Sequence, residues 1–269
     1  MRDPLNQETA GFSLIGPSGT GKTAILKRAL KSQTAFRSAS PEAGGNALLV
    51  TVPPEATSKS LAEEVARQTG YGAIAARANG YQAWGIVRHR LRLLGIRLLI
   101  IDEAHHLLRP GPGRDILGAL QSLKHLLQGE DSTAVILAGV DKLKQGLLQD
   151  PETARRFKPF ELMRITEGSQ DARRFARSMQ ICAHELGLIL PEANFAERVL
   201  FAENGDAGLS FRFAKQVLKR TVEAGRDRIT LEDARWVFND QRPEATMTPF
   251  AEGDWDMVQA GLIKAGWSN

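Results

Sequence analysis

The chain has 269 residues, of which 42% are hydrophobic and 25% charged, and its formal net charge is +4. These values are typical of a globular protein and exclude a disordered, collagen-like or disulfide-rich chain. Cys182 is the only cysteine, so no internal disulfide can form and a reducing cytoplasm is the expected compartment. No apolar run approaches the roughly 18 residues that cross a bilayer, and the start lacks a signal-peptide pattern, so no membrane association is expected.

Short apolar runs alternate with amphipathic stretches over residues 1–166. This alternation predicts an α/β domain in which helices cover both faces of a parallel sheet. The clearest helix has apolar residues spaced three and four apart between Ile116 and Leu127, and it ends at Gly129. The five predicted strands are residues 12–15, 48–52, 98–101, 134–138 and 159–163.

Strand alternation stops near Glu167, and helical patterns continue to about residue 240. We therefore predict a small all-α domain over residues 167–240. Its helices are expected at residues 170–186, from Pro191 and Glu192 to near Gly205, at residues 209–224, and from a capping box of Thr230 and Asp233 to about Phe238. The third of these places an apolar face on Phe211, Ala214, Leu218 and Val222.

Residues 241–269 are expected to form a linker with two prolines and an acidic tail helix. From Asp240 onward there are five acids and two bases, a net charge of −3, so the preceding 239 residues carry +7. Either the helix docks a partner or a neighbouring subunit, or it packs on its own helical domain; both alternatives stay open. Its apolar face holds Trp255, Val258, Leu262, Ile263 and Trp267.

A phosphate-binding sequence follows the first predicted strand. Residues 16–23 read GPSGTGKT, which fits the pattern G-x-x-x-x-G-K-[ST] throughout. Small residues let backbone N–H groups surround the β-phosphate, and the N-terminus of the next helix adds partial positive charge. Lys22 is expected to reach the β- and γ-phosphates, and the Thr23 hydroxyl to bind Mg²⁺. The predicted ATP-binding residues are Gly16, Pro17, Ser18, Gly19, Thr20, Gly21, Lys22, Thr23 and Ala24.

Two acids end the third predicted strand. The run LLIIDE at residues 98–103 brings Asp102 and Glu103 to the carboxyl edge of the sheet, where ligands of open α/β folds bind. Asp102 is expected to hold Mg²⁺, usually through water, and Glu103 to polarise the attacking water. Hydrolysis of ATP is therefore expected as well as binding.

The residues after Asp102 allow two other interpretations. Residues 102–105 spell the DEAH box of a helicase class, but those helicases need two RecA-like domains, whereas the second half of this chain is a small helical domain. His105 and His106 suggest a metal site, yet no cluster of cysteines or carboxylates completes it. Both histidines are expected to lie on the surface or to support the neighbouring acids.

A P-loop α/β domain followed by a small helical lid resembles the plan of the AAA+ ATPases. In detail the chain resembles the TniB/TnsC family of transposition ATPases over most of residues 11–238. The Gly-Tyr after the second helix, the IDEAHH run and the ARRF segment are more particular to this family than the P-loop. The segments that carry the resemblance are GPSGTGKT at 16–23, VPPEATSKSLAEEVARQTGY at 52–71, LLIIDEAHHLL at 98–108, QSLKHLLQ at 121–128, ILAGVDKL at 136–143 and ETARRFKPFEL at 152–162.

The resemblance implies an ATP- and Mg²⁺-dependent homo-oligomer, a ring or helical filament, on double-stranded DNA. Such proteins connect a target-selection protein to a DDE transposase. Arg155 and Arg156, ahead of Phe157, match the arginine finger that reaches the γ-phosphate held by a neighbouring subunit; which of the two acts stays open. Arg212 matches the lid arginine called sensor 2.

Two features depart from the family pattern. The sensor 1 position usually carries Asn or Thr, but here it is Val140, followed by Asp141. Either Asp141 substitutes or the attacking water is weakly positioned, so slow hydrolysis, stimulated by assembly or DNA, is expected. The chain also starts about ten residues before its first strand. Contacts that a longer N-terminal extension makes in relatives are therefore expected to be reduced or supplied elsewhere.

Duplex DNA is bound through its phosphates by Lys and Arg. The candidates are Lys59, at the start of the second helix, and Arg77, in the following segment, because this region tends to face the pore of AAA+ rings. Arg88, Arg90 and Arg92 are as easily explained as a solvated helix face, since their spacing spreads them around the helix.

The leading hypothesis is an ATP-hydrolysing, oligomerising DNA-binding regulator of transposition. A second is an ATPase of another process: a replication initiator, a clamp-loader-like protein or a secretion-associated ATPase. The lack of a C-terminal winged-helix domain disfavours the initiator, and the lack of a transmembrane segment disfavours secretion. A third is a nucleotide-gated scaffold whose hydrolysis is incidental.

Overall fold

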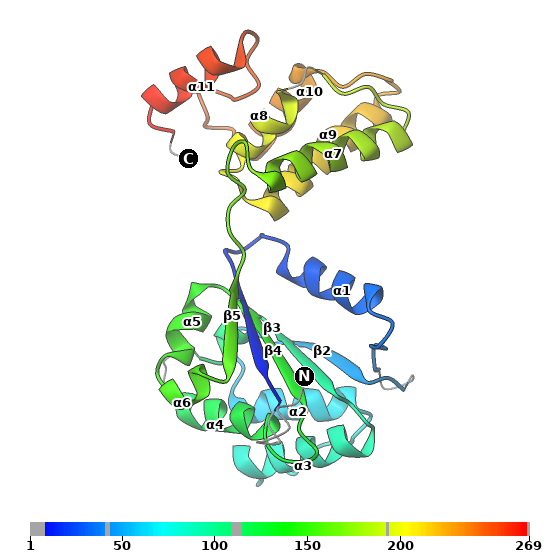
Figure 1. Ribbon diagram of the computed structural model, residues 1–269, viewed down its shortest axis with the longest axis vertical. Helices are drawn as coiled ribbons and strands as arrows, with labels where there is room; N and C mark the ends of the chain where they lie inside the picture. The colour runs from blue at the N-terminus through cyan, green and yellow to red at the C-terminus, as the bar shows by residue number, and fades with distance from the viewer. Residues whose placement is uncertain (1–8, 41–43, 109–114, 192–193, 268–269) are drawn as a thin grey trace. The chain divides into compact units, whose positions relative to one another are not determined.

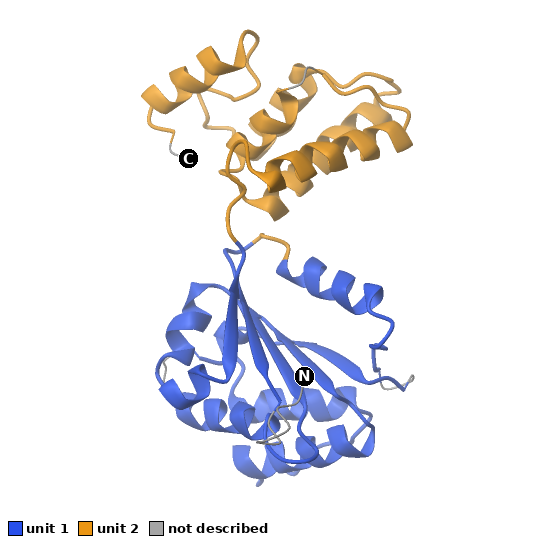
Figure 2. Cartoon of the chain, in the orientation of Figure 1, with its two compact units in different colours: residues 1–18, 22–162 blue, residues 19–21, 163–269 orange. Residues whose placement is uncertain are grey.

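The computed structural model describes residues 9–40, 44–108, 115–191 and 194–267. The chain divides into two compact units (Figure 2). The α/β unit consists of residues 1–18 and 22–162, and the helical unit of residues 19–21 and 163–269. Each unit has its own apolar core. Among the described residues, no helix combines the length and apolarity that spanning a membrane requires.

A five-stranded sheet with the order β2-β3-β4-β1-β5 forms the centre of the α/β unit (Figure 1). All four strand pairs are parallel, as the sequence predicts. The fifth strand begins at Phe157, two residues earlier than predicted, and contains Pro159. Because this strand lies at an edge of the sheet, the missing N–H of proline is tolerated. The strands are β1 (Gly11–Ile15), β2 (Ala47–Thr51), β3 (Leu98–Asp102), β4 (Ala134–Gly139) and β5 (Phe157–Glu161).

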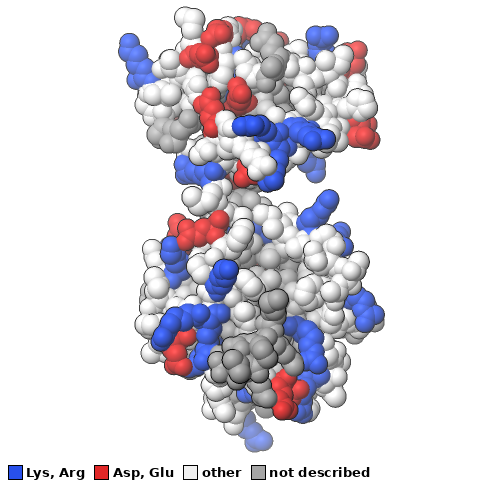
Figure 3. Space-filling view, viewed as in Figure 1, with Lys and Arg blue, Asp and Glu red and all other residues white. Residues whose placement is uncertain are grey.

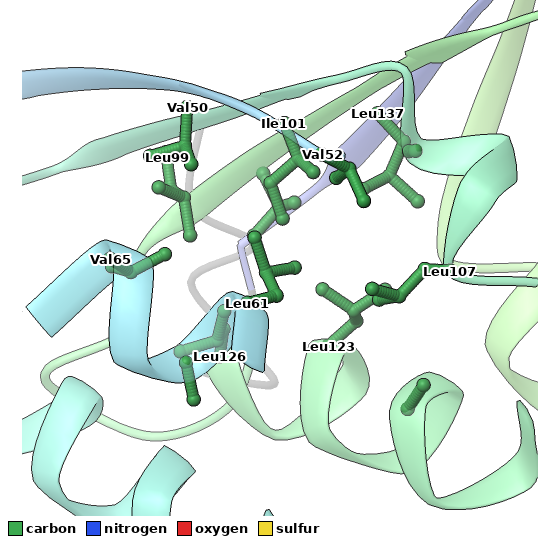
Figure 4. Packing of buried hydrophobic residues seen from close by; sticks show 14 of the residues in the cluster. Val50, Val52, Leu61, Val65, Leu99, Ile101, Leu107, Leu123, Leu126 and Leu137 are labelled. Carbon is green, nitrogen blue, oxygen red and sulfur yellow. The ribbon is translucent and has the colours of Figure 1, made fainter. Parts of the chain in front are cut away.

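Helices cover both faces of the sheet. On one face, α1 (Lys22–Ser32) packs Leu26 and Leu30 against the strands. The other face carries α2 (Ser58–Gln68), α4 (Ile116–Leu126), α5 (Asp141–Leu147) and the short 3₁₀ helix η1 (Ala104–His106), with α3 (Gly80–Leu93) packed against α2 and α4. Figure 4 shows the aliphatic side chains of this face: Val50, Val52, Leu61, Val65, Leu99, Ile101, Leu107, Leu123, Leu126 and Leu137. Each such buried side chain contributes about 1.5–3 kcal/mol to folding.

The helical unit contains the helices predicted from sequence, with shifted ends. They are α7 (Gln170–Glu185), α8 (Phe195–Ala202), α9 (Ala207–Glu223), α10 (Leu231–Gln241) and α11 (Trp255–Lys264). The second begins at Phe195 rather than Pro191, and Glu192 lies outside the described residues. The predicted capping box is confirmed: the Asp233 N–H donates to Thr230 Oγ1, and the Thr230 N–H donates to Asp233 Oδ2.

The predicted apolar face of α9 is wrong in part. Ala214 and Leu218 are buried, but Phe211 and Val222 are each 47% exposed. Because α9 packs against α8 and α10, its buried stripe is centred on Ser210, Val217 and Thr221, and the two exposed side chains fall beyond the Leu218 margin of that stripe.

The tail helix α11 packs on its own unit. Trp255 and Leu262 are buried, and the Trp255 ring lies edge-on to Phe201 with centroids 5.4 Å apart. Trp267 stacks on Phe201 at 6.1 Å. The structure therefore favours packing of the tryptophans on their own helical unit over docking of a partner. Ile263, which was predicted on the same apolar face, is instead 52% exposed.

A buried arginine anchors this tail. Arg198 has no exposed surface and donates hydrogen bonds to the backbone carbonyls of Pro249, Ala251 and Gly253. Its guanidinium also lies 5.0 Å from the Trp255 ring. Because three carbonyls depend on one side chain, residues 249–255 are fixed to α8.

Candidate nucleotide-binding site

The P-loop leaves the sheet at the carboxyl end of β1. The Gly16 N–H donates to the Gly139 carbonyl at 3.1 Å, which ties the start of the loop to β4. Gly19 and Gly21 have φ values of +89° and +82°, in the left-handed region where a Cβ is strained. Helix α1 begins at Lys22, so its N-terminal N–H groups follow the loop directly, as anion binding requires.

Lys22 is held inside the loop. Its side chain is buried, and its Nζ donates to the carbonyls of Gly16 at 2.9 Å and Pro17 at 2.7 Å. These bonds place the ammonium beside the backbone that is expected to surround a phosphate.

Thr23 and Asp102, the two predicted magnesium ligands, are in contact. The Thr23 hydroxyl donates to Asp102 Oδ2 at 2.5 Å, and Asp102 Oδ1 accepts the Glu103 N–H at 2.9 Å. The Asp102 carboxyl is only 1% exposed. A hydroxyl and a carboxylate side by side supply the hard oxygen ligands that Mg²⁺ prefers, so the residues present fit this ion.

Glu103 occupies a left-handed backbone conformation with φ +57°. Its Oε2 lies 3.3 Å from Nδ1 of His105, which is buried, whereas the Glu103 side chain is 37% exposed. The atoms of Glu103, His105 and His106 that could bind a metal lie within 4.8 Å of one another. His105 therefore lies against the Glu103 carboxylate, in line with the predicted supporting role.

The position after β4 lies beside the P-loop strand. Gly139 pairs with Ile15, so the ends of β4 and β1 are adjacent. Val140 then precedes α5 without a side-chain cap, and Asp141 is the exposed first residue of that helix. A valine side chain forms no hydrogen bond, and an ionised aspartate only accepts them. Neither side chain reproduces the donor of an asparagine or threonine.

Arg155 and Arg156 lie at the opposite edge of the sheet from the P-loop. The residue after them, Phe157, pairs with Gly11 at the start of β1, whereas the loop follows Ile15 at its end. At about 3.3 Å per residue, four residues of strand separate these edges by roughly 13 Å. Neither arginine therefore begins near the P-loop of its own α/β unit.

The two arginines differ in their surroundings. Arg155 is exposed, and its Nε donates to the Pro151 carbonyl at 3.2 Å. The Arg156 side chain is 20% exposed and lies 4.0 Å from the Glu152 carboxylate. Arg155 is therefore the more accessible of the pair.

Helix α6 (Pro151–Ala154), which precedes these arginines, is capped by Asp150. Its Oδ1 accepts the Glu152 N–H at 3.2 Å, and its Oδ2 accepts the Thr153 hydroxyl at 2.6 Å. The Thr153 hydroxyl bond holds the pKa of the Asp150 carboxyl below its ordinary value. An ionised cap at this helix N-terminus fixes the turn from which the arginines extend.

Arg212 lies in the helical unit, in the second turn of α9, whose N-terminus is capped by Asp206. Its side chain is exposed and forms no hydrogen bond or ion pair with any residue that the structure describes. The guanidinium is thus available to an external anion.

The structure brings the two DNA-contact candidates together. Lys59 Nζ donates to the Ala76 carbonyl at 2.7 Å, next to the exposed Arg77, and lies 3.8 Å from Glu63. On the visible face of the α/β unit, Lys and Arg cover more of the surface than Asp and Glu (Figure 3). The candidates therefore share one region of the surface.

Helix α3 divides its arginines between two faces. Arg90 donates to the Thr69 carbonyl at 2.6 Å. Arg88 and Arg92 are exposed on another face, where Arg92 forms an ion pair with Asp131 at 3.3 Å. That face also carries Tyr81, which is 77% exposed and was not selected from sequence. A pocket of about 560 Å³ between α2, α3 and α4 is lined by Lys59, Tyr81, Arg88 and His125 among others. Tyr81 and Arg88 are seven residues apart, a spacing that places both side chains on one face of a helix and could have indicated this surface from the sequence.

Comparison with known proteins gives a family and a fold. The profile of the family described as bacterial TniB protein matches residues 1–167. No curated protein matches the chain.

Several solved structures are similar. The Aeropyrum pernix ORC1 protein in complex with DNA gives a TM-score of 0.61 at 16% identity, covering 87% of this chain and 60% of that one. The ORC2 protein of the same organism gives 0.59 at 14% identity, covering 86% and 62%. The Thermotoga maritima RuvB Holliday junction branch migration motor gives 0.52 at 16%, covering 87% and 62%. The chain spans about three fifths of these proteins, and at such identities the likeness shows the fold, that of a P-loop AAA+ ATPase.

Proposed function

Since the chain belongs to the TniB family and has the fold of the AAA+ ATPases, we propose that it is an ATP-dependent, oligomerising DNA-binding regulator of transposition. It links target DNA to a transposase, and ATP hydrolysis controls its assembly and disassembly. The contact between Thr23 and Asp102 beside a complete P-loop is the observation that carries the proposal. In this proposal residues 1–166 are the ATPase domain, residues 167–240 its lid and residues 241–269 a linker and tail helix.

Residues 16–24 bind the nucleotide in this proposal. Lys22 binds the β- and γ-phosphates, and Thr23 and Asp102 hold Mg²⁺, which neutralises charge on the phosphate oxygens. Glu103, directed by His105, orients and polarises the attacking water. Burial of Lys22 and Asp102 supports this assignment, because charges in a dry site interact more strongly than in water.

The active form is an assembly. Arg155 is the preferred finger because it is exposed and lies at the edge of the sheet opposite its own P-loop, while Arg156 is near the Glu152 carboxylate. Arg212 acts as sensor 2. Hydrolysis is slow, because Val140 and Asp141 offer no donor where other AAA+ proteins have one.

Double-stranded DNA is the proposed effector, bound through phosphates by Lys59 and Arg77. Their shared location supports a single interface, and the pocket beside them continues it along Tyr81 and Arg88. A DDE transposase and a target-selection protein are the proposed protein partners, on the strength of family membership. The cytoplasm is the proposed compartment.

Electron microscopy with a non-hydrolysable ATP analogue and duplex DNA tests the proposal. We expect rings or helical filaments that require both nucleotide and DNA, and their loss when Lys22→Ala removes the phosphate contact. Particles that remain monomeric with nucleotide and DNA contradict the proposal.

The second candidate is an ATPase of replication initiation, favoured by the fold likeness to the two Aeropyrum pernix ORC proteins. The two functions differ in their partners. The neighbouring genes separate them. A neighbouring transposase whose strand transfer is stimulated by this protein supports the first, and a neighbouring replication gene with no transposase supports the second.

A further inference from the structure

An apolar groove lies between α7 and α9 of the helical unit. It has a volume of about 690 Å³, and its walls include Leu186, Phe211 and Val222, which are 52%, 47% and 47% exposed. In the helical unit these large apolar side chains are exposed to water, as is typical of a surface that binds a partner. Cys182, the only cysteine of the chain, also lines the groove and is exposed.

The border of the groove has one basic charge in excess. The charged residues that line it are Lys215, Lys219 and Glu223. Lys219 is paired with Glu223 at 3.5 Å, but Lys215 makes no ion pair with any residue in the described ranges. A segment that fills this groove is therefore expected to combine apolar side chains with acids.

Helix α11 presents such a segment on its outer side. Trp255 and Leu262 face inward, while Met257 and Ile263 are 77% and 52% exposed, with the exposed Ala260 between them. The same outer side carries the exposed Asp256 and Lys264, so it combines apolar side chains with charged ones. Three exposed acids, Glu252, Asp254 and Asp256, precede or begin this helix.

The two surfaces cannot meet within one chain. Helix α8 lies between them, contacting α7 and α9 on one side and α11 through Phe201 on the other (Figure 1). The Arg198 bonds to residues 249–253 and the bond from Gln259 to Glu167 hold α11 in place. A second copy of the chain is the occupant that brings the acidic helix to the basic groove.

We propose that the outer face of α11 in one copy docks into the α7–α9 groove of the next copy. Because each copy offers both surfaces at different places, the contact is head-to-tail and propagates into a ring or filament. The inference deepens the proposed oligomerisation and rests on it, since it names one of the contacts that joins neighbouring subunits. The contact also gives a reason for the anchoring of the tail by Arg198. A helix that is already fixed loses little conformational entropy when its outer face binds a partner.

Thiol cross-linking of two single-cysteine chains tests the contact. One chain keeps Cys182; the other carries Cys182→Ser with Met257→Cys and a tag that changes its size. They are mixed with ATP analogue and duplex DNA and treated with a short bismaleimide linker. We expect a cross-linked heterodimer in clear excess over the homodimer of either chain. A chain that carries Met257→Cys and keeps Cys182 is expected to give a ladder of multimers.

The matched control moves the second thiol to Glu232→Cys, an equally exposed position on α10 outside both surfaces. Preferential linking at 257 over 232, abolished by Leu186→Asp in the groove, supports the proposal. Assemblies that form by light scattering yet give no more linking at 257 than at 232 overturn it and leave the proposed function standing. Chains that neither assemble nor cross-link contradict both.

Discussion

The Thr23 hydroxyl donates a 2.5 Å hydrogen bond to Asp102 Oδ2, joining the first turn of α1 to the end of β3 across 79 residues of sequence. Only strand β4 separates β1 from β3 in the sheet. Because the carboxyl ends of parallel strands meet at one edge, the P-loop and the acidic strand deliver their side chains to the same place.

Replacing Asp102 by Asn tests how much the negative charge of Asp102 contributes to binding of Mg·ATP. Asn keeps the shape and a hydrogen-bond acceptor for Thr23 but loses the charge that favours Mg²⁺. We expect affinity for Mg·ATP to fall about 10- to 100-fold, since a charge-assisted interaction contributes about 1.5–3 kcal/mol. Binding of a fluorescent ATP analogue with Mg²⁺ and with EDTA measures it. Thr23→Ser, which keeps the hydroxyl, serves as control; an Asp102→Asn variant that binds Mg·ATP as tightly as wild type removes Asp102 from the metal site.

Substitutions of Arg155 and Arg156 are expected to affect different properties of the protein. Arg155→Ala should lower assembly-stimulated ATP hydrolysis by about 10³-fold or more, the contribution of an arginine finger. Arg156→Ala should lower it less and instead reduce the free energy of unfolding, because Arg156 is largely buried beside Glu152. Turnover per subunit in the assembled state, together with urea denaturation, distinguishes them. The assignment fails if Arg156→Ala abolishes turnover while Arg155→Ala retains it.

DNA affinity should depend on Lys59 and Arg77 and on salt. Replacing each by Gln removes one phosphate contact and should reduce the slope of log affinity against log salt by about 0.9 per site. Titration of fluorescent duplex DNA at several salt concentrations, with ATP analogue present, gives this slope. Lys31→Gln, an exposed lysine at the end of α1, is the matched control. An unchanged slope in the Lys59, Arg77 double variant places the DNA elsewhere.

Arg198 should stabilise the tail helix. Arg198→Met keeps much of the apolar bulk but leaves the carbonyls of Pro249, Ala251 and Gly253 without their donor. Leaving buried acceptors unsatisfied costs about 1–3 kcal/mol each when no water replaces the donor, so α11 should lose its amide protection. Hydrogen exchange of α11 measures the loss. Arg235→Met, on the exposed side of α10, should change protection little; equal protection in Arg198→Met would show that the tail is held by its aromatic contacts alone.

The sequence predicts local features of this fold well. The continuous apolar run of β3 identifies that strand, because a sheet covered on both faces buries all five of its residues. The edge strand β5 is less well predicted, since only its first residue, Phe157, is buried. The P-loop is recognisable because the phosphate chemistry fixes spacing within eight residues. Proximity of Thr23 to Asp102 follows from the strand topology rather than from either motif.

Long-range partners are what the sequence conceals. Arg198 bonds carbonyls more than 50 residues away, and a carbonyl partner leaves no trace in residue types. The exposure of Phe211 and Val222 depends on where α8 and α10 pack around α9, which helical periodicity does not specify. Likewise, the bond from Lys59 to the Ala76 carbonyl is invisible without the structure.

Glu103→Gln tests the central claim most directly, because it separates assembly from hydrolysis. The substitution keeps the shape of the side chain and removes the base, so ATP hydrolysis should fall by about 10²- to 10⁴-fold while ATP binding persists. The measurement is the lifetime of assemblies on duplex DNA after ATP is added, followed by light scattering. The account predicts that wild-type assemblies disperse as ATP is consumed and that Glu103→Gln assemblies persist. Wild-type and Glu103→Gln assemblies that disperse at the same rate would contradict it.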